Sequence, residues 1–224
     1  MHFHIITLFP GAFDSYLGES ILKRAIEDKK IKVSFYNPRD FTKDKFRRID
    51  RKPFGGGPGM VIEALPVIKA IERALRQAQG RAFKTKIKPK IIFLSPSGKQ
   101  FTNEYASKVA NKYKDIIIIS GRYEGIDARV KKVFKTEEVS VGPFVLTGGE
   151  LAAMLMIDSI SRQVEGVLGN FDSREESRIS TKDVYTRPEI FEYNGKKLRV
   201  PKILLSGHRA KIDEWKNKQN KKNA

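Results

Sequence analysis

The chain contains no cysteine and only three histidines among its 224 residues. The absence of cysteine excludes disulfides, thiolate nucleophiles, iron–sulfur clusters and every zinc site that uses thiolate ligands. His2 and His4 would share one face of a strand, but a metal ion would need further ligands, so we expect no metal site. The motif G-x-S-x-G is also missing, which argues against an α/β-hydrolase.

Long hydrophobic runs are missing as well. The longest apolar stretch is Leu151–Ile157, far shorter than the roughly 20 residues of a membrane-spanning helix. The first residues lack the basic region of a signal peptide, and Pro10-Gly11 interrupts them. We therefore expect a cytoplasmic protein with no membrane partner.

Positive charge dominates the ionisable residues. Lys and Arg number 44 against 26 Asp and Glu, which gives a formal net charge of +18. Such an excess usually indicates a polyanionic partner, most often nucleic acid, although charge alone also fits simple solubilisation. Hydrophobic residues make up 40% and charged residues 31%, which is typical of a globular chain and not of a disordered one.

Strand-like and helix-like segments alternate over the first 162 residues. This alternation predicts an α/β fold with a mostly parallel sheet. The expected strands cover residues 2–8, 31–36, 90–94, 115–120 and 137–141. The expected helices cover residues 13–29, 63–79, 102–113 and 151–162, with Thr102 as the N-cap of the third.

The pattern changes from residue 164, where the sequence becomes polar and rich in charge. We therefore expect a domain over residues 1–163, a linker over 164–185, and a small C-terminal domain with a basic tail over 186–224. Within the last part we expect a strand-like stretch at 199–206 and a helix at 210–218. Gly80 is expected to end the second helix, with residues 81–90 as a basic linker.

Three of the expected strands run into glycine-bearing loops: 94–98 (LSPSG), 121–127 (GRYEGID) and 142–150 (GPFVLTGGE). In a parallel sheet the carboxyl ends of the strands meet at one edge, where ligands bind. Tyr123 and Phe144 are suited to stacking on an adenine, and Glu124 and Asp127 to binding a ribose, a cation or a base edge. The sequence therefore predicts a ligand site at this edge, although it matches neither the dinucleotide fingerprint nor a P-loop.

A basic stretch precedes the glycine-rich string PFGGGPGM at residues 53–60. Its cations are Arg39, Lys43, Lys45, Arg47, Arg48, Arg51 and Lys52. Such a loop is suited to a phosphate or a flat base, and the alternative is a loop that only packs.

Nine strings spread over most of the chain carry a family resemblance: IITLFPGAF, NPRDFT, FGGGPGM, LSPSG, SGRYEGIDARV, VGPFVLTGGELAAMLMIDSISR, GVLG, YTRPE and LLSGHRAKIDEW. Together they resemble the TrmD family of bacterial tRNA (guanine-N1)-methyltransferases, which are knotted SPOUT-type enzymes. The family uses S-adenosylmethionine to methylate N1 of the guanosine just 3′ of the anticodon. The resemblance implies an α/β domain with a C-terminal trefoil knot, tRNA as partner, and an obligate homodimer with active sites at the interface. It does not decide whether Mg²⁺ is required.

The resemblance also implies roles for individual residues. Glu176 takes the position of the family's general base, with Glu175 as the fallback, Arg162 reaches toward the target guanine, and Glu124 lies beside the methyl donor. The donor pocket would comprise Ser95, Pro96, Gly121, Tyr123, Val141, Gly142, Pro143, Phe144, Val145, Leu146, Gly148 and Gly149. Recognition of tRNA or of the target base would fall to Arg24, Asp50, Gly57, Gly59 and Arg122.

The sequence departs from the family pattern at several points. The linker is shortened before Val184, and Pro143 and Phe144 replace residues that are commonly acidic and tyrosine. The family's base is usually an aspartate, and Glu176 has one more methylene. Family members also carry further helices beyond the position of Trp215, so we expect a short tRNA-binding domain whose lost contacts are compensated by basic residues.

Two other functions fit the same sequence. One is a related knotted methyltransferase that acts on another RNA position. The other is a non-catalytic RNA-binding protein that uses its basic surface alone, and it predicts no affinity for a methyl donor.

Overall fold

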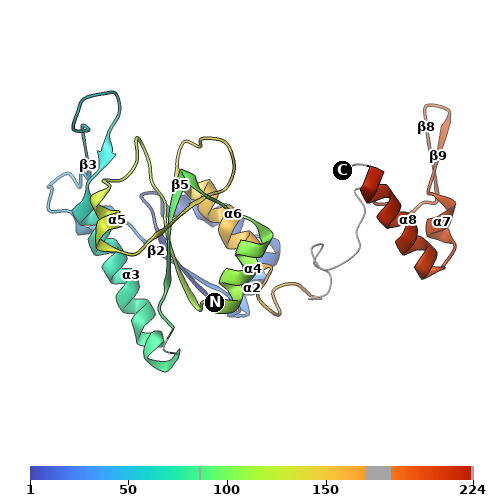
Figure 1. Ribbon diagram of the computed structural model, residues 1–224, viewed down its shortest axis with the longest axis horizontal. Helices are drawn as coiled ribbons and strands as arrows, with labels where there is room; N and C mark the ends of the chain where they lie inside the picture. The colour runs from blue at the N-terminus through green and yellow to red at the C-terminus, as the bar shows by residue number, and fades with distance from the viewer. Residues whose placement is uncertain (86, 170–182, 223–224) are drawn as a thin grey trace. The chain divides into compact units, whose positions relative to one another are not determined.

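The computed structural model describes residues 1–85, 87–169 and 183–222 (Figure 1). The chain divides into two compact units, Met1–Phe171 and Asp172–Ala224. The first unit is an α/β domain. The second contains a two-stranded hairpin and two helices, α7 (Lys202–Leu205) and α8 (Arg209–Lys222).

A five-stranded sheet forms the centre of the first unit. Its strands are β1 (His2–Ile6), β2 (Lys32–Tyr36), β5 (Lys90–Gln100), β6 (Asp115–Ile119) and β7 (Glu137–Ser140). They lie in the order β2-β1-β6-β5-β7, and every neighbouring pair is parallel. The predicted α/β class with a mostly parallel sheet is therefore confirmed.

Helices cover both faces of the sheet, and this explains the run of four isoleucines in β6. Ile116 and Ile118 belong to one hydrophobic core, and Ile117 and Ile119 belong to the other. The first core packs under α1 (Asp14–Leu17), α2 (Ser20–Glu27), α4 (Asn103–Lys112) and α6 (Gly149–Ser161). The second packs under α3 (Ala64–Thr85) and α5 (Arg129–Val133).

Short elements connect these layers. Two 3-10 helices, η1 (Pro10–Phe13) and η2 (Pro38–Phe41), follow β1 and β2. A small antiparallel pair, β3 (Asp50–Arg51) and β4 (Val61–Ile62), encloses the glycine-rich string. The described residues include no helix long and apolar enough to cross a membrane.

Thr102 caps α4 as predicted and accepts a hydrogen bond from the Tyr105 N–H at 3.2 Å. Two other helices differ from the prediction. The helix expected over 13–29 is split into α1 and α2, because the chain turns at Gly18 and Ser20 has a positive φ of 51°. Gly80 does not end the second helix, since α3 continues to Thr85. A helix tolerates one glycine at a cost of about 1 kcal/mol, so the basic linker expected over 81–90 was wrong for its first half.

The prediction for the second unit was wrong over residues 199–206. Of that stretch only Arg199 is in a strand, β9 (Lys196–Arg199), and residues 202–205 form α7. β9 pairs with β8 (Ile190–Tyr193) in a hairpin that was not predicted. Asn194-Gly195 lies between the two strands, and this dipeptide is the strongest short-range hairpin signal. The expected helix at 210–218 is present within the longer α8.

Candidate functional site

The three glycine-bearing segments converge on a cavity of about 310 Å³. Residues 121–127 and 142–150 follow β6 and β7, whereas residues 94–98, expected as a loop, lie within β5, where the pairing with β7 is irregular between Leu94 and Lys99. The shared cavity confirms the expectation that the three segments converge at one edge of the sheet. The volume lies at the lower end of the range for small-molecule sites. Most of the walls are apolar, and the polar groups come from the loop backbones and a few side chains, as in typical ligand pockets.

Most of the residues predicted to bind the donor line this cavity. Those that do are Ser95, Pro96, Gly121, Tyr123, Val141, Phe144, Val145, Leu146, Gly148 and Gly149. Gly142 and Pro143 are not among the lining residues. The Phe144 ring lies against Gly142, where an added Cβ would come within 2.1 Å of a ring carbon.

The two aromatic residues of the cavity are only half-buried. The exposed fraction is 52% for Tyr123 and 52% for Phe144. Tyr123 has a φ of 59°, a left-handed conformation that is uncommon outside glycine and concentrates at functional sites. Both rings therefore remain accessible to a planar ligand such as an adenine.

A buried ion pair joins two of the cavity loops. Arg122 Nε lies 2.8 Å from Glu150 Oε2, and the Glu150 side chain is almost fully buried. Glu150 also accepts a hydrogen bond of 2.8 Å from the Thr7 hydroxyl at the end of β1. The Arg122 guanidinium lies 4.6 Å from the centre of the Phe9 ring. Arg122 lines the cavity, so the residue predicted to recognise the substrate also links the loops that form the site.

The glycine-rich string is attached to the loop that carries Glu124. The Glu124 N–H donates to the Met60 carbonyl at 3.0 Å, and the Ile62 N–H donates to the Gly125 carbonyl at 3.0 Å. Gly59 has a φ of 80°, and a Cβ there would come within 2.5 Å of the Glu124 carboxylate. Glu124 itself lines the cavity. The structure thus brings the predicted substrate residues Gly57 and Gly59 near the predicted donor site.

Arg162 lies in a different place. It follows the last turn of α6 and lines a second cavity of about 540 Å³ with Tyr16, Leu151, Leu155 and Asp158. The Tyr16 hydroxyl donates to the Asp158 carboxylate, and this hydrogen bond raises the pKa of Tyr16. Within one chain, the structure therefore does not bring Arg162 into the cavity that the three loops form.

The remaining predicted residues are not part of the cavity. Arg24 is exposed on α2, and Asp50 pairs with Ile62 in the β3–β4 ladder. The Asp127 carboxylate accepts hydrogen bonds from the backbone N–H and from the guanidinium of Arg129, and the side-chain hydrogen bond lowers the pKa of Asp127. Glu175 and Glu176 lie outside the described residues.

Sequence reasoning missed several lining residues and the ion pair. The additional lining residues are Leu94, Gly125, Val139, Ser140, Thr147 and Ala152. Glu124 was predicted beside the donor and Arg122 was predicted to recognise the substrate, and both line the cavity as well. Leu94, Gly125 and Thr147 belong to the three loops that the sequence singled out. Val139 and Ser140 are the last residues of β7, and the rule that ligands bind at the carboxyl ends of parallel strands is the signal that finds them.

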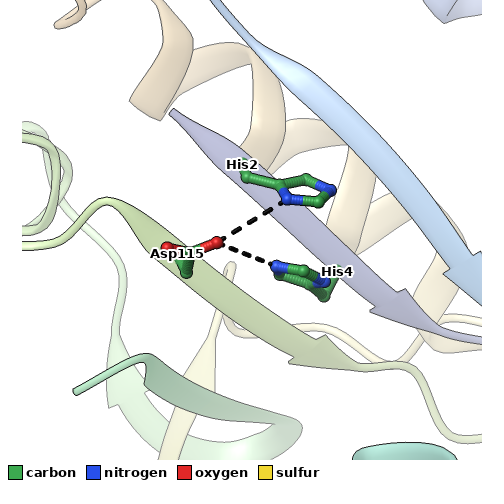
Figure 2. Close-up of side chains that lie close together, drawn as sticks. All are labelled: His2, His4 and Asp115. Atoms are coloured by element: carbon green, nitrogen blue, oxygen red, sulfur yellow. Dashed lines mark hydrogen bonds and ion pairs between the residues drawn. The ribbon is translucent and has the colours of Figure 1, made fainter. Parts of the chain in front are cut away.

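A buried group of His2, His4 and Asp115 lies at the opposite ends of the strands (Figure 2). His4 Nε2 lies 3.1 Å and His2 Nδ1 lies 3.6 Å from the Asp115 carboxylate. The second nitrogen of each ring is hydrogen-bonded to a hydroxyl on β2. His2 Nε2 lies 2.8 Å from the Ser34 hydroxyl, and His4 Nδ1 lies 2.8 Å from the Tyr36 hydroxyl. The group offers three ligand atoms, one fewer than a structural zinc site, and it joins β2, β1 and β6 by hydrogen bonds.

The fold and the cavity together define a class of protein: a parallel α/β domain with a cavity at the carboxyl edge of its sheet. The sequence matches the family described as tRNA (Guanine-1)-methyltransferase TrmD over residues 1–224. The chain therefore belongs to this family, as the strings predicted.

Individual relatives agree with this assignment. The chain is 44% identical over 223 residues to the tRNA (guanine-N(1)-)-methyltransferase of Clostridioides difficile (strain 630), covering 98% of this chain and 92% of the relative. It is 46% identical over 219 residues to the protein of the same description from Thermomicrobium roseum, covering 96% and 77%.

Proposed function

We propose that this chain transfers a methyl group from S-adenosylmethionine to N1 of the guanosine just 3′ of the anticodon in tRNA. The observation that carries the proposal is the cavity of three converging loops in a chain that matches the methyltransferase family over its whole length. Its apolar walls, accessible aromatic rings and close-lying glycines fit the adenine and the methionine chain of the donor.

The chemistry sets clear demands on the protein. Guanine N1 carries a proton, so a carboxylate has to accept that proton as the new bond to carbon forms. A cation near O6 stabilises the negative charge that develops there. The donor supplies an already activated methyl group as a sulfonium, so holding both substrates in line contributes most of the remaining acceleration.

We assign these tasks to the residues that match the family positions. Glu176 accepts the N1 proton, and Arg162 stabilises charge on the guanine. Glu124, which lines the cavity, provides negative charge beside the donor sulfonium. Arg24, Asp50, Gly57, Gly59 and Arg122 recognise the tRNA or its target base.

We also infer a trefoil knot in the first unit. β7 lies at one edge of the sheet, and β6 lies in the middle with β5 between them. The chain that leaves β7 reaches past β5, because the Gly149 N–H donates to the Gly121 carbonyl at 2.9 Å and Gly148 pairs with Arg122. This crossing over the end of a neighbouring strand supports a threaded chain.

The functional division we propose has a donor-binding domain over 1–163, a linker with the base over 164–185, and a tRNA-binding domain over 186–224. The separation of the chain into two compact units near residue 171 supports this arrangement.

We expect the protein to be a homodimer in solution. Arg162 and the donor cavity are separate within one chain, and exposed Leu151 and Leu155 border the cavity that contains Arg162. A second copy that covers this apolar surface would complete the site. Sedimentation equilibrium should give twice the monomer mass, and Leu151→Asp should weaken the dimer and lower methylation. An active monomer would contradict the expectation.

We expect methylation to fall steeply with salt while donor binding does not. The net charge of +18 is suited to phosphate contacts, and each phosphate neutralised adds to the slope of log K against log salt. The donor instead fits a mainly apolar cavity. KM for tRNA and Kd for the donor, both measured from about 50 to 200 mM salt, test this difference. Equal slopes would count against separate surfaces for the two substrates.

Calorimetric titration with S-adenosylmethionine tests the donor site itself. The proposal predicts one donor site per chain, and Gly149→Ala should abolish the binding. A Cβ at that position would lie 2.7 Å from the Ser120 Cα, so the cavity loop would have to move. Gly80→Ala is the matched control, since nothing lies within 4 Å of that position. A wild-type protein without donor affinity would favour the non-catalytic alternative.

A further inference from the structure

The β8–β9 hairpin is a separate feature of the second unit, and Figure 1 shows it extending away from α7 and α8. Asn194 and Gly195 have φ values of 48° and 70°, as a tight two-residue hairpin turn requires. Every residue from Ile190 to Arg199 is exposed. An isolated two-stranded hairpin is marginally stable in water, so this one is suited to gaining stability from a partner.

One face of the hairpin carries both of its aromatic side chains. Phe191 pairs with Leu198 and Tyr193 pairs with Lys196, and alternate residues of a strand point to the same side. The exposed fraction is 54% for Phe191 and 63% for Tyr193. Their rings are almost parallel, at 8°, with centres 6.4 Å apart. The face therefore presents two aligned aromatic rings to solvent.

One cation lies on this aromatic face. Lys196 is on the same side of the hairpin as the rings, while Lys197 and Arg199 alternate with it along β9 and lie on the opposite side, and Lys202 begins α7. Glu192, the one acidic residue within the two strands, also lies on the opposite side. Proteins that bind unpaired nucleotides combine the same two features, because bases stack on aromatic rings while cations contact the phosphates. A protein partner would call for an apolar face without a cation beside the rings.

We propose that the Phe191–Tyr193 face binds an unpaired base of the tRNA by stacking, with Lys196 contacting an adjacent phosphate. The inference rests on the proposed function, since it takes tRNA as the substrate. It assigns to the hairpin a role in holding the tRNA that is independent of the methyl transfer itself.

Replacing the rings by leucine tests stacking against simple apolar contact. Phe191→Leu and Tyr193→Leu retain apolar side chains but remove the π-faces. Each should weaken tRNA binding by about five- to a hundredfold, the range measured for base–aromatic stacking. Phe191→Tyr and Tyr193→Phe keep the rings and should bind as the wild type does. Ile190→Ala, on the other face of the hairpin, should have little effect.

Salt dependence separates the two kinds of contact. The leucine variants should leave the slope of log K against log salt unchanged, whereas Lys196→Ala should reduce its magnitude by about one. Donor Kd, measured by calorimetry, should stay at the wild-type value in every variant.

The outcomes distinguish this inference from the proposed function. A wild-type protein that methylates tRNA while both leucine variants bind tRNA normally would overturn the stacking role and leave the activity intact. Leucine variants that bind tRNA normally while Phe191→Asp changes the sedimentation of the RNA-free protein would assign the face to a protein contact instead. A wild-type protein that binds tRNA without methylating it, with the leucine variants weakened, would support the hairpin and contradict the proposed activity.

Discussion

The Glu176→Gln variant is expected to lose methylation by about a hundred- to ten-thousandfold, the usual cost of removing a general base. This corresponds to roughly 3–5 kcal/mol of activation free energy. Glutamine keeps the shape of the side chain and one hydrogen-bonding oxygen, but it does not accept the N1 proton. The loss should appear in kcat, with the donor Kd and the dimer unchanged, because the group acts in the transition state.

Glu175→Gln is the matched control, since it makes the same change at the adjacent position and should be mild. If Glu175→Gln is inactive while Glu176→Gln methylates normally, the general base is Glu175. If both variants turn over normally, neither Glu175 nor Glu176 is the base. Glu124, which lines the donor cavity, or Asp183 is then the next candidate.

The second large effect is expected at Glu150, on stability as well as on binding. Glu150→Gln removes the charge that pairs with Arg122 and leaves that guanidinium partly buried, with only 27% of its side chain exposed. Breaking a buried pair by removing one partner costs about 3–5 kcal/mol, and the residual exposure of Arg122 favours the lower end of that range. Because the pair joins two loops of the cavity, donor affinity should fall as well.

Glu138→Gln provides the control for this variant. Glu138 pairs with Lys131 at 2.9 Å, but the exposed fraction is 34% for the Lys131 side chain and 37% for the Glu138 side chain. Exposed pairs contribute about 0–1 kcal/mol, so urea unfolding should show little change. Equal losses of stability in the two variants would show that the Arg122–Glu150 pair does not hold the cavity loops together.

The features of the fold that were predictable follow from local patterns. The alternation of strands and helices predicts a parallel sheet, and the carboxyl ends of parallel strands meet at one edge. The loops after β6 and β7 therefore had to converge with the irregular second half of β5, and Ser95, Gly121 and Gly149 line the same cavity. Once the sheet was predicted, this part of the site needed no information on tertiary contacts.

The features that were missed depend on contacts between residues remote in the sequence. Thr7, Arg122 and Glu150 come from three separate segments, and no local spacing indicates that they form one network. Arg162 lies at the far end of α6 from the cavity loop, and the helix carries it to another surface. The hairpin at Asn194-Gly195 was the exception, because its signal was local and was not used.

The most direct test of the account is transfer of a labelled methyl group from S-adenosylmethionine to tRNA transcripts that differ only at the nucleotide 3′ of the anticodon. The account predicts methylation of the transcript with guanosine at that position, mapped to N1, and none when adenosine replaces it. Equal labelling of both transcripts, or labelling of a ribose, would contradict the proposed reaction.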